Sequence, residues 1–118
     1  MKYMALIYSE EADPSTVPAE QWQEIMDAYI KFGEDARAAG VMLAGDALQP
    51  TSTATVVRVR DGRTLTTDGP FVETREALGG YYVFEAKDLD EAIEWAARLP
   101  GSWHGSVEVR PVMEFPSA

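Results

Sequence analysis

The order of strand-like and helix-like runs limits the folds open to this sequence more than any other feature. Residues 2–8 are almost continuously apolar, which is typical of a central strand with both faces covered. Amphipathic helices are predicted over residues 18–39 and from Asp88 to Leu99. Asp61-Gly62 is a strong signal for the turn of a hairpin. The other predicted strands are residues 41–48, 53–60, 63–67, 79–86 and 106–115.

This gives the order strand, helix, strand, hairpin, strand, helix, strand. Without the hairpin the order is βαββαβ, so we expect an α+β fold of the ferredoxin-like type with an inserted β-hairpin. Two helices cover only one face of such a sheet, and the other face carries Val, Tyr and Phe side chains that a single copy would leave in water. The sequence therefore predicts a homodimer in which sheet faces or extended strands meet.

Each predicted helix carries an apolar stripe at three- and four-residue steps. Gly40 stands where a left-handed residue would end the first helix, and Asp88 with Glu91 forms a capping pair at the start of the second. The expected core residues are Trp22, Ile25, Met26, Tyr29, Phe32, Gly33 and Ala36 in the first helix, and Leu89, Ala92, Ile93, Ala96 and Leu99 in the second.

Length, charge and cysteine content exclude several classes of protein. With 118 residues we expect one domain, residues 1–118. The absence of cysteine excludes disulfides, thiol ligands and thiol nucleophiles. The net charge of −10 argues against general binding to nucleic acid or anionic membranes. There is no apolar run of transmembrane length and no signal-peptide pattern, so we expect a cytoplasmic location.

The loop TDGPFVETRE, residues 67–76, is the most distinctive stretch. An Asp in a turn normally accepts a hydrogen bond from the N–H two residues on, but Pro70 has no N–H to offer Asp68. Gly69 can adopt a backbone conformation closed to other residues, and Phe71 is expected to be an apolar anchor. The loop is predicted to leave the Asp68 carboxylate free to bind another group. Alternatively, Asp68 caps the turn and the loop is only a rigid corner.

A polar pocket is expected where this loop meets the ends of the first and last strands. Gly45 interrupts its strand as a bulge or a close approach would, so Asp46 projects into a cleft or is simply an exposed carboxylate. Asp68 and Asp46 are candidate catalytic residues, because two close carboxylates in a poorly hydrated cleft raise each other's pKa. The candidate ligand-binding residues are Arg110, Tyr8, Glu73 and Phe71, with Arg110 as an anion clamp. Alternatively, Arg110 pairs with Asp68 or Glu108 and fixes the loop.

His104 is the only histidine and lies in a predicted loop before the last strand. It is a third catalytic candidate because histidine titrates near neutrality, although a lone loop histidine is usually just exposed. One histidine without cysteine argues against a zinc site, and no phosphate-binding glycine loop or nucleophile elbow is present. We therefore expect neither a metal nor a cofactor. The acidic connection over residues 9–14 is interpreted as a solvated loop.

Six motifs span nearly the whole chain: KYMALIY, AAGVMLAGDALQP, VRVRDGR, TDGPFVETREALGGYYVFE, LDEAIEWAARLP and GSVEVRPV. Together they resemble the YciI-related DGPF-domain family. The resemblance implies a ferredoxin-like fold, assembly as a dimeric α/β barrel, bacterial origin and, for many members, association with extracytoplasmic-function sigma factors. It also implies an enzyme-like pocket with a His–Asp pair, the His on the first helix. This chain has Glu20 in about that region and Ala38 in place of the Asp, so the pair does not carry over.

Three functions are compatible with these features. The first is a cofactor-independent acid–base enzyme of lyase, isomerase or hydrolase type, acting on a small polar or anionic molecule. The second is a noncatalytic dimer that binds a small ligand or contacts a partner such as a sigma factor, and the missing pair favours it. The third is an accessory dimer with a rigid corner and no ligand.

Overall fold

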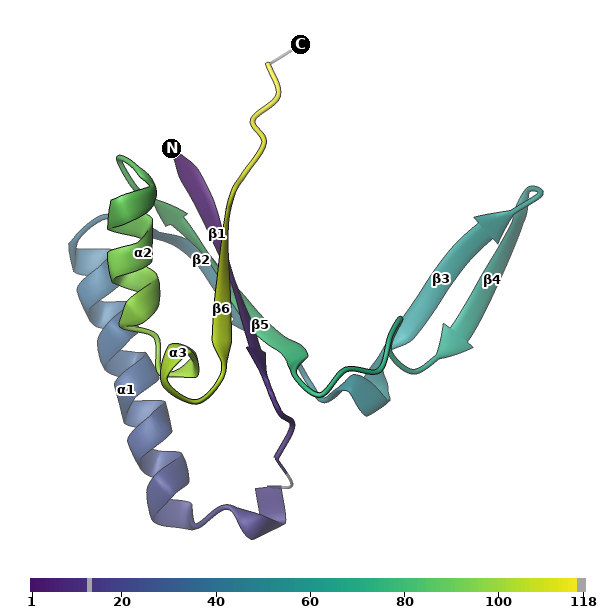
Figure 1. Cartoon of the computed structure of the whole chain (residues 1–118), viewed down its shortest axis with the longest axis horizontal. Coiled ribbons are helices and arrows are strands. Elements are labelled where there is room, and N and C mark those ends of the chain that lie inside the picture. The colour runs from purple at the N-terminus through teal and green to yellow at the C-terminus, as the bar shows by residue number, and fades with distance from the viewer. Residues whose placement is uncertain (13, 117–118) are drawn as a thin grey trace.

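The computed structural model describes residues 1–12 and 14–116 and has the predicted order of elements (Figure 1). The inserted hairpin is present between the second and third strands of the main sheet. The elements are β1 Lys2–Ser9, η1 Pro14–Thr16, α1 Ala19–Ala38, β2 Met42–Ala47, η2 Thr51–Thr53, β3 Thr55–Arg60, β4 Arg63–Asp68, β5 Ala77–Glu85, α2 Leu89–Ala97, α3 Gly101–His104 and β6 Ser106–Pro111.

The main sheet has four strands in the order β2-β5-β1-β6, and all three pairings are antiparallel. This order is that of the ferredoxin-like βαββαβ arrangement, which confirms the predicted fold class. β3 and β4 pair only with each other, in a separate two-stranded sheet. β6 ends at Pro111, earlier than predicted, and the chain beyond it remains attached to β1 through the Val112 N–H, which donates to the Lys2 carbonyl over 2.8 Å.

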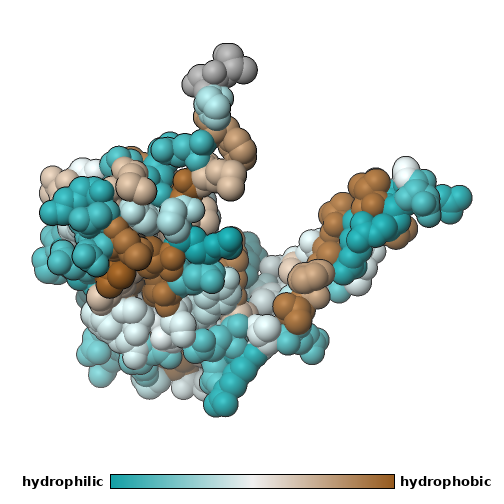
Figure 2. Space-filling view, turned by 45° about the horizontal axis from the view of Figure 1, so that its top comes forward, coloured by the Kyte–Doolittle hydropathy of each residue, from teal (hydrophilic) through white to brown (hydrophobic). Residues whose placement is uncertain are grey.

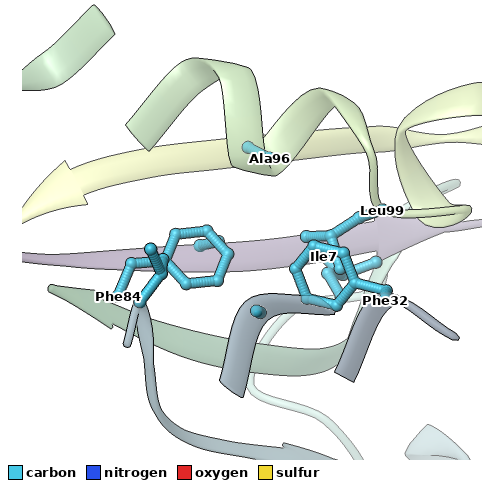
Figure 3. Close-up of a cluster of buried hydrophobic side chains, with 8 residues drawn as sticks. Ile7, Phe32, Phe84, Ala96 and Leu99 are labelled. Carbon is cyan, nitrogen blue, oxygen red and sulfur yellow. The ribbon is translucent and has the colours of Figure 1, made fainter. Parts of the chain in front are cut away.

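The core lies between the main sheet and the helices, which cover one side of it (Figures 1 and 3). Phe84 and Leu99 are its largest fully buried side chains. The Phe32 ring meets Tyr82 edge-on at a centroid distance of 5.2 Å and Trp95 at 6.0 Å. These contacts tie α1, β5 and α2 together, because aromatic rings prefer such edge-to-face packing.

The predicted helix stripes are correct only in part. In α1 the buried residues Phe32, Gly33 and Ala36 all lie in the second half, whereas Trp22 and Met26 are exposed. The first half of α1 also carries apolar side chains at helical spacing, but none of them is buried. In α2, Ala92 and Ala96 are buried, while Leu89 and Ile93 are exposed. Trp95 packs against the core instead, so the face of α2 that points inward includes Trp95 and not Leu89 or Ile93.

None of the described helices covers the other side of the sheet, and we call this side the open face. Side chains alternate across a strand, and Tyr3, Ala5, Ile7 and Phe84 point toward the helices. Their neighbours in the strands therefore point to the open face. By the pairing register its residues are Met4, Leu6 and Tyr8 of β1, Tyr81 and Val83 of β5, Asp46 of β2, and Glu108 and Arg110 of β6. Phe84 of β5 lies on the other side and is fully buried in the core.

The β3–β4 hairpin, residues 55–68, forms an arm that leaves the body on the side of the sheet opposite the helices (Figure 1). Its turn is formed as predicted, with positive φ at Asp61 (52°) and Gly62 (74°). Figure 2 shows apolar side chains along the arm. Val57 is 61% exposed and Val59 is 59% exposed.

The arm joins the body at neighbouring points of the sheet. The Leu48 N–H donates to the Gly79 carbonyl over 2.8 Å, so the inserted segment leaves β2 and returns to β5 side by side. The Gly69 N–H, at the other end of β4, donates to the Ala54 carbonyl over 2.8 Å and closes the base of the hairpin. Gly69 has a φ of +102°, as expected for a position that only glycine occupies readily.

Candidate functional site

A cleft of about 710 Å³ lies at the end of the sheet where β1 finishes. One side of the cleft is the first half of α1, and the other is formed by the segment that leads into β5 and by α3. The exposed Trp22 side chain of α1 lines this cleft and forms an apolar wall with Ile25 and Val17. The cleft is lined by Ser9, Glu10, Ala12, Val17, Gln21, Trp22, Ile25, Arg75, Glu76 and His104.

Two glycines place His104 in this cleft. A Cβ on Gly101 would lie 2.5 Å from Cγ2 of Ile7 and 3.1 Å from the Tyr29 hydroxyl. A Cβ on Gly105 would collide with the Tyr8 carbonyl oxygen. Only residues without a side chain allow α3 to lie so close to β1 and α1. His104 lies between these contacts, at the last position of α3, with its side chain exposed. The predicted loop is therefore a short helix.

The charged groups of the cleft come from two distant segments. Glu10, just after β1, forms an ion pair with Arg75, which lies before β5. The neighbouring Glu76 accepts a hydrogen bond from the Ser106 hydroxyl through Oε2 over 3.1 Å. Because the Arg75 and Glu10 side chains are both exposed, their pair contributes little stability and is free to rearrange around a bound anion.

A second cleft, of about 550 Å³, lies on the neighbouring surface of α1 and shares three residues with the first. Gln21, Ile25 and His104 line both clefts, so His104 stands between them. Glu20 and Glu24 line the second cleft as well. His104 enters this cleft from α3, whereas Glu20 and Glu24 belong to α1.

Tyr8, Asp46 and Arg110 share the open face on three different strands, β1, β2 and β6. Asp46 accepts a hydrogen bond from the Tyr81 hydroxyl over 2.8 Å. This bond and the negative charge of Asp46 raise the pKa of Tyr81, because they favour the protonated hydroxyl. Gly45 beside Asp46 is a close approach rather than a bulge. A Cβ there would lie 2.5 Å from the Tyr82 ring, and the register shift comes earlier, between Met42 and Ala44.

Residues 68–71, which we call the DGPF corner, lie at the base of the arm. Asp68 is the last residue of β4, is exposed, and lines neither of the clefts that contain His104. In residues 1–12 and 14–116 its carboxylate has no hydrogen-bond or ion-pair partner. Phe71 does not anchor the loop, because its side chain is 77% exposed and does not reach the core. The Arg58 guanidinium lies 5.5 Å from the centre of its ring.

Glu73 lines a third cleft, of about 600 Å³, between the corner and the segment that follows β1. Glu11 lies on the opposite side and accepts hydrogen bonds from the N–H and the hydroxyl of Thr51, over 2.7 and 2.9 Å. Glu10 and Glu11 lie in the connection that the sequence predicts to be a solvated loop. They are exposed, but each also binds one end of the inserted segment, Glu11 through Thr51 and Glu10 through Arg75.

The model of the YCII-related domain matches residues 1–116 of the chain. The chain belongs to the YCII-related family. An uncharacterised protein of Rhizobium meliloti (strain 1021) is 34% identical to it over 114 residues, which amount to 95% of this chain and 92% of that protein. The family resemblance stated from the motifs is thus confirmed over nearly the full length of this YCII-related chain.

Several cleft residues of this YCII-related chain were not among the predicted site residues. Glu10 had been assigned to a loop and Trp22 to the core, while Arg75 and Glu76 lay unremarked within the DGPF stretch. The one available signal was Trp22, since a tryptophan near the start of a helix is a candidate for a wall as well as for a core. The charged residues carry no local signal, because only the antiparallel register brings the end of β1 beside the start of β5.

The described residues form neither a cluster of metal ligands nor a helix that could cross a membrane. Residues 1–12 and 14–116 contain no group of three or more His, Asp or Glu side chains arranged to hold a metal ion. In the same residues, no helix combines the length and the apolar character needed to cross a membrane.

Proposed function

We propose that this chain is a cofactor-independent acid–base enzyme that acts on a small polar or anionic molecule in the cleft beside α1. The supporting observation is the meeting of His104, Glu10, Glu76 and Arg75 around one space of about 710 Å³. An imidazole and a carboxylate can transfer protons, and a guanidinium beside them can bind an anionic substrate.

Each group has a distinct role in this proposal. His104 accepts or donates the proton, since a neutral imidazole has one nitrogen that accepts a proton and one that donates it. Arg75 binds an anionic group of the substrate in exchange for Glu10, which is then free to accept a proton or a hydrogen bond. Trp22 and Ile25 give the apolar wall against which the carbon skeleton packs. Glu76 keeps its hydrogen bond from the Ser106 hydroxyl and so holds the start of β6 beside α3.

We also propose that the chain acts as a homodimer in which the open faces of the two copies pack against each other. The centre of the open face is apolar, with Met4, Leu6 and Val83, while Asp46, Glu108 and Arg110 lie on the outer strands. Two such faces would bury the apolar centre and enclose the polar groups. In that enclosure Asp46, Tyr8 and Arg110 are the proposed ligand contacts. Asp68, at the end of the arm, and Phe71 and Glu73, in the segment that follows it, would border the enclosure.

A second candidate function is noncatalytic binding of the same class of ligand by a regulatory dimer. The exposure of the Glu10 and Arg75 side chains favours it, because water competes for charged groups that catalysis uses best when it is excluded. A sigma factor is the kind of partner that the family resemblance suggests for such a dimer.

The test starts with a thermal-shift screen of small carboxylates, hydroxy acids and phosphates, since a ligand that binds the folded state raises the melting temperature. Each hit is then incubated with the protein and followed by NMR for chemical change. We expect His104→Gln to lower turnover by about 100-fold or more and to leave the melting temperature of the free protein unchanged. Glu94→Gln, an exposed substitution on α2, is the control and should keep full turnover.

The outcomes separate the two candidates. Turnover that survives His104→Gln would contradict the enzymatic role of this cleft. A ligand that stabilises the protein and is never transformed would support the binding function. Arg75→Gln should weaken binding of anionic hits in either case, with no effect on uncharged ones.

A further inference from the structure

The arm carries apolar side chains that the described part of the chain leaves exposed. Its two faces differ, because residues paired across β3 and β4 point the same way. One face carries Val57 and Val59 with their partners Thr66 and Thr64, and it bears no charge beyond Asp68 at its base. The opposite face carries Val56 and Leu65 together with all three arginines of the arm, Arg58, Arg60 and Arg63, so the two faces differ in charge.

A hairpin of this kind needs a surface to lie on. An isolated two-stranded ribbon is at best marginally stable in water. Val57 and Val59 are 61% and 59% exposed although both are β-branched residues typical of a packed sheet. Exposed apolar side chains gathered on one face of a projecting element mark an interaction surface.

The charge of the arm indicates the partner. The chain contains 10 basic and 20 acidic residues, for a net charge of −10. Residues 55–68 contain three arginines against Asp61 and Asp68, so the arm is positive while the rest of the chain is strongly negative. The three arginines lie on the face opposite Val57 and Val59, so they do not enter the docked face. They attract the acidic body of a second copy from the edge of the contact and steer association.

The direction of the arm fits the same partner. It projects on the open-face side of the sheet, where the second copy is proposed to dock (Figure 1). Its base is held in place by the hydrogen bonds from Thr51 to Glu11 and by the Leu48–Gly79 backbone hydrogen bond. A fixed base presents the arm in one orientation and reduces the entropy lost on docking.

We propose that the arm of each copy clasps the body of the other through the Val57–Val59 face. The inference rests on the proposed dimer but not on the proposed chemistry of the cleft. In the clasp, Asp68 shares the docked face and is carried to the contact between the copies. This gives a place to the carboxylate that lacks a partner in the described part of its own chain.

The first experiment measures dimer dissociation by sedimentation velocity over a dilution series. We expect Val57→Ser/Val59→Ser to raise the dissociation constant by about tenfold or more. Leu65→Ser removes an exposed apolar side chain from the opposite face of the same arm and is the matched control, expected to leave the constant unchanged. Raised salt should weaken the wild-type dimer, because the arginines act through screened charges.

The second experiment does not depend on how well the variants fold. The chain has no cysteine, so Arg63→Cys accepts a single spin label near the turn of the arm. Mixed dimers of this labelled copy with a ¹⁵N-labelled wild-type copy report only contacts between copies. We expect paramagnetic broadening of amides in the body of the ¹⁵N-labelled copy.

Three results would overturn the clasp: an unchanged dissociation constant in the double variant, broadening confined to the arm or absent, or a monomeric wild-type protein. The first two leave the open-face dimer and the cleft chemistry standing. The third removes both the clasp and the dimer, while turnover that depends on His104 would still support the cleft.

Discussion

Gly45 shows how one missing side chain shapes the core. The Tyr82 ring occupies the space where a Cβ would lie 2.5 Å away, and that ring is held in turn by Phe32 and Phe84 at centroid distances of 5.2 and 6.2 Å. The ring cannot move aside without disturbing this group. Burial also raises the pKa of the Tyr82 hydroxyl, because the phenolate would lose its hydration.

We predict that Gly45→Ala destabilises the protein by about 1–3 kcal/mol, the usual cost of forcing an atom into a packed core. Gly79→Ala is the matched control, since a Cβ on Gly79 meets nothing within 4 Å. Urea unfolding measures the free energy of unfolding of both variants, and an unchanged m-value shows that the difference is one of stability. Equal stabilities for the two variants would show that the Tyr82 ring has room to move.

At the scale of elements, Asp35 joins the two main helices. Its Oδ2 accepts hydrogen bonds from Lys31 Nζ over 3.2 Å within α1 and from Arg98 Nη2 over 2.6 Å at the end of α2. The Arg98 guanidinium also lies 4.5 Å above the Trp95 ring. The hydrogen bond from Lys31, and then the contacts with Arg98, lower the pKa of Asp35 below 3.8.

The stability from this carboxylate should depend on pH. Since the pKa is lowered by folding, the stabilisation is present above the ordinary value of 3.8 and is lost as the pH falls through the lower folded-state pKa. We therefore expect Asp35→Asn to melt below wild type near neutral pH, with the difference vanishing in acid. Glu34→Gln, at the exposed neighbouring position, should follow wild type throughout. A difference that is constant with pH would contradict the assignment.

The predictions from sequence were most accurate for elements. Gly40, with a φ of +71°, ends α1, and Asp88 Oδ1 accepts the Glu91 N–H over 2.9 Å, both as the local residue types require. The core stripe of α1 was wrong at Trp22 and Met26 for a physical reason. Periodicity tells which side of a helix faces inward, but not how far the layer beneath it extends.

At the scale of the whole molecule, the candidate site could be predicted only in fragments. His104 was a candidate, but its neighbours Glu10 and Arg75 are far from it and from each other in the chain. Their meeting depends on the antiparallel register of β1 and β5 and on the close packing that Gly101 and Gly105 allow. No local pattern encodes that register together with the packing of α3.

The uncovered sheet leads to a prediction for the assembly. We expect Leu6→Lys, which places a charge at the centre of the open face, to give a folded monomer, since the proposed dimer would have to bury the ammonium group. Ile30→Lys, at an exposed apolar position on α1, is the control and should remain dimeric. Light scattering after gel filtration distinguishes them, and circular dichroism verifies that both are folded. A Leu6→Lys dimer would exclude this face as the contact.

The hydrogen bond between the Leu48 N–H and the Gly79 carbonyl has a consequence for how such a protein can diverge. Since the chain departs from the sheet and rejoins it at adjacent residues, everything between them behaves as a cassette. We expect that relatives can lengthen, trim or replace this cassette while their layers of helix and strand stay the same, because loops with closely spaced ends tolerate changes of length. A cassette that reaches a second copy would then let one scaffold acquire new pairing preferences without any change to its own interior.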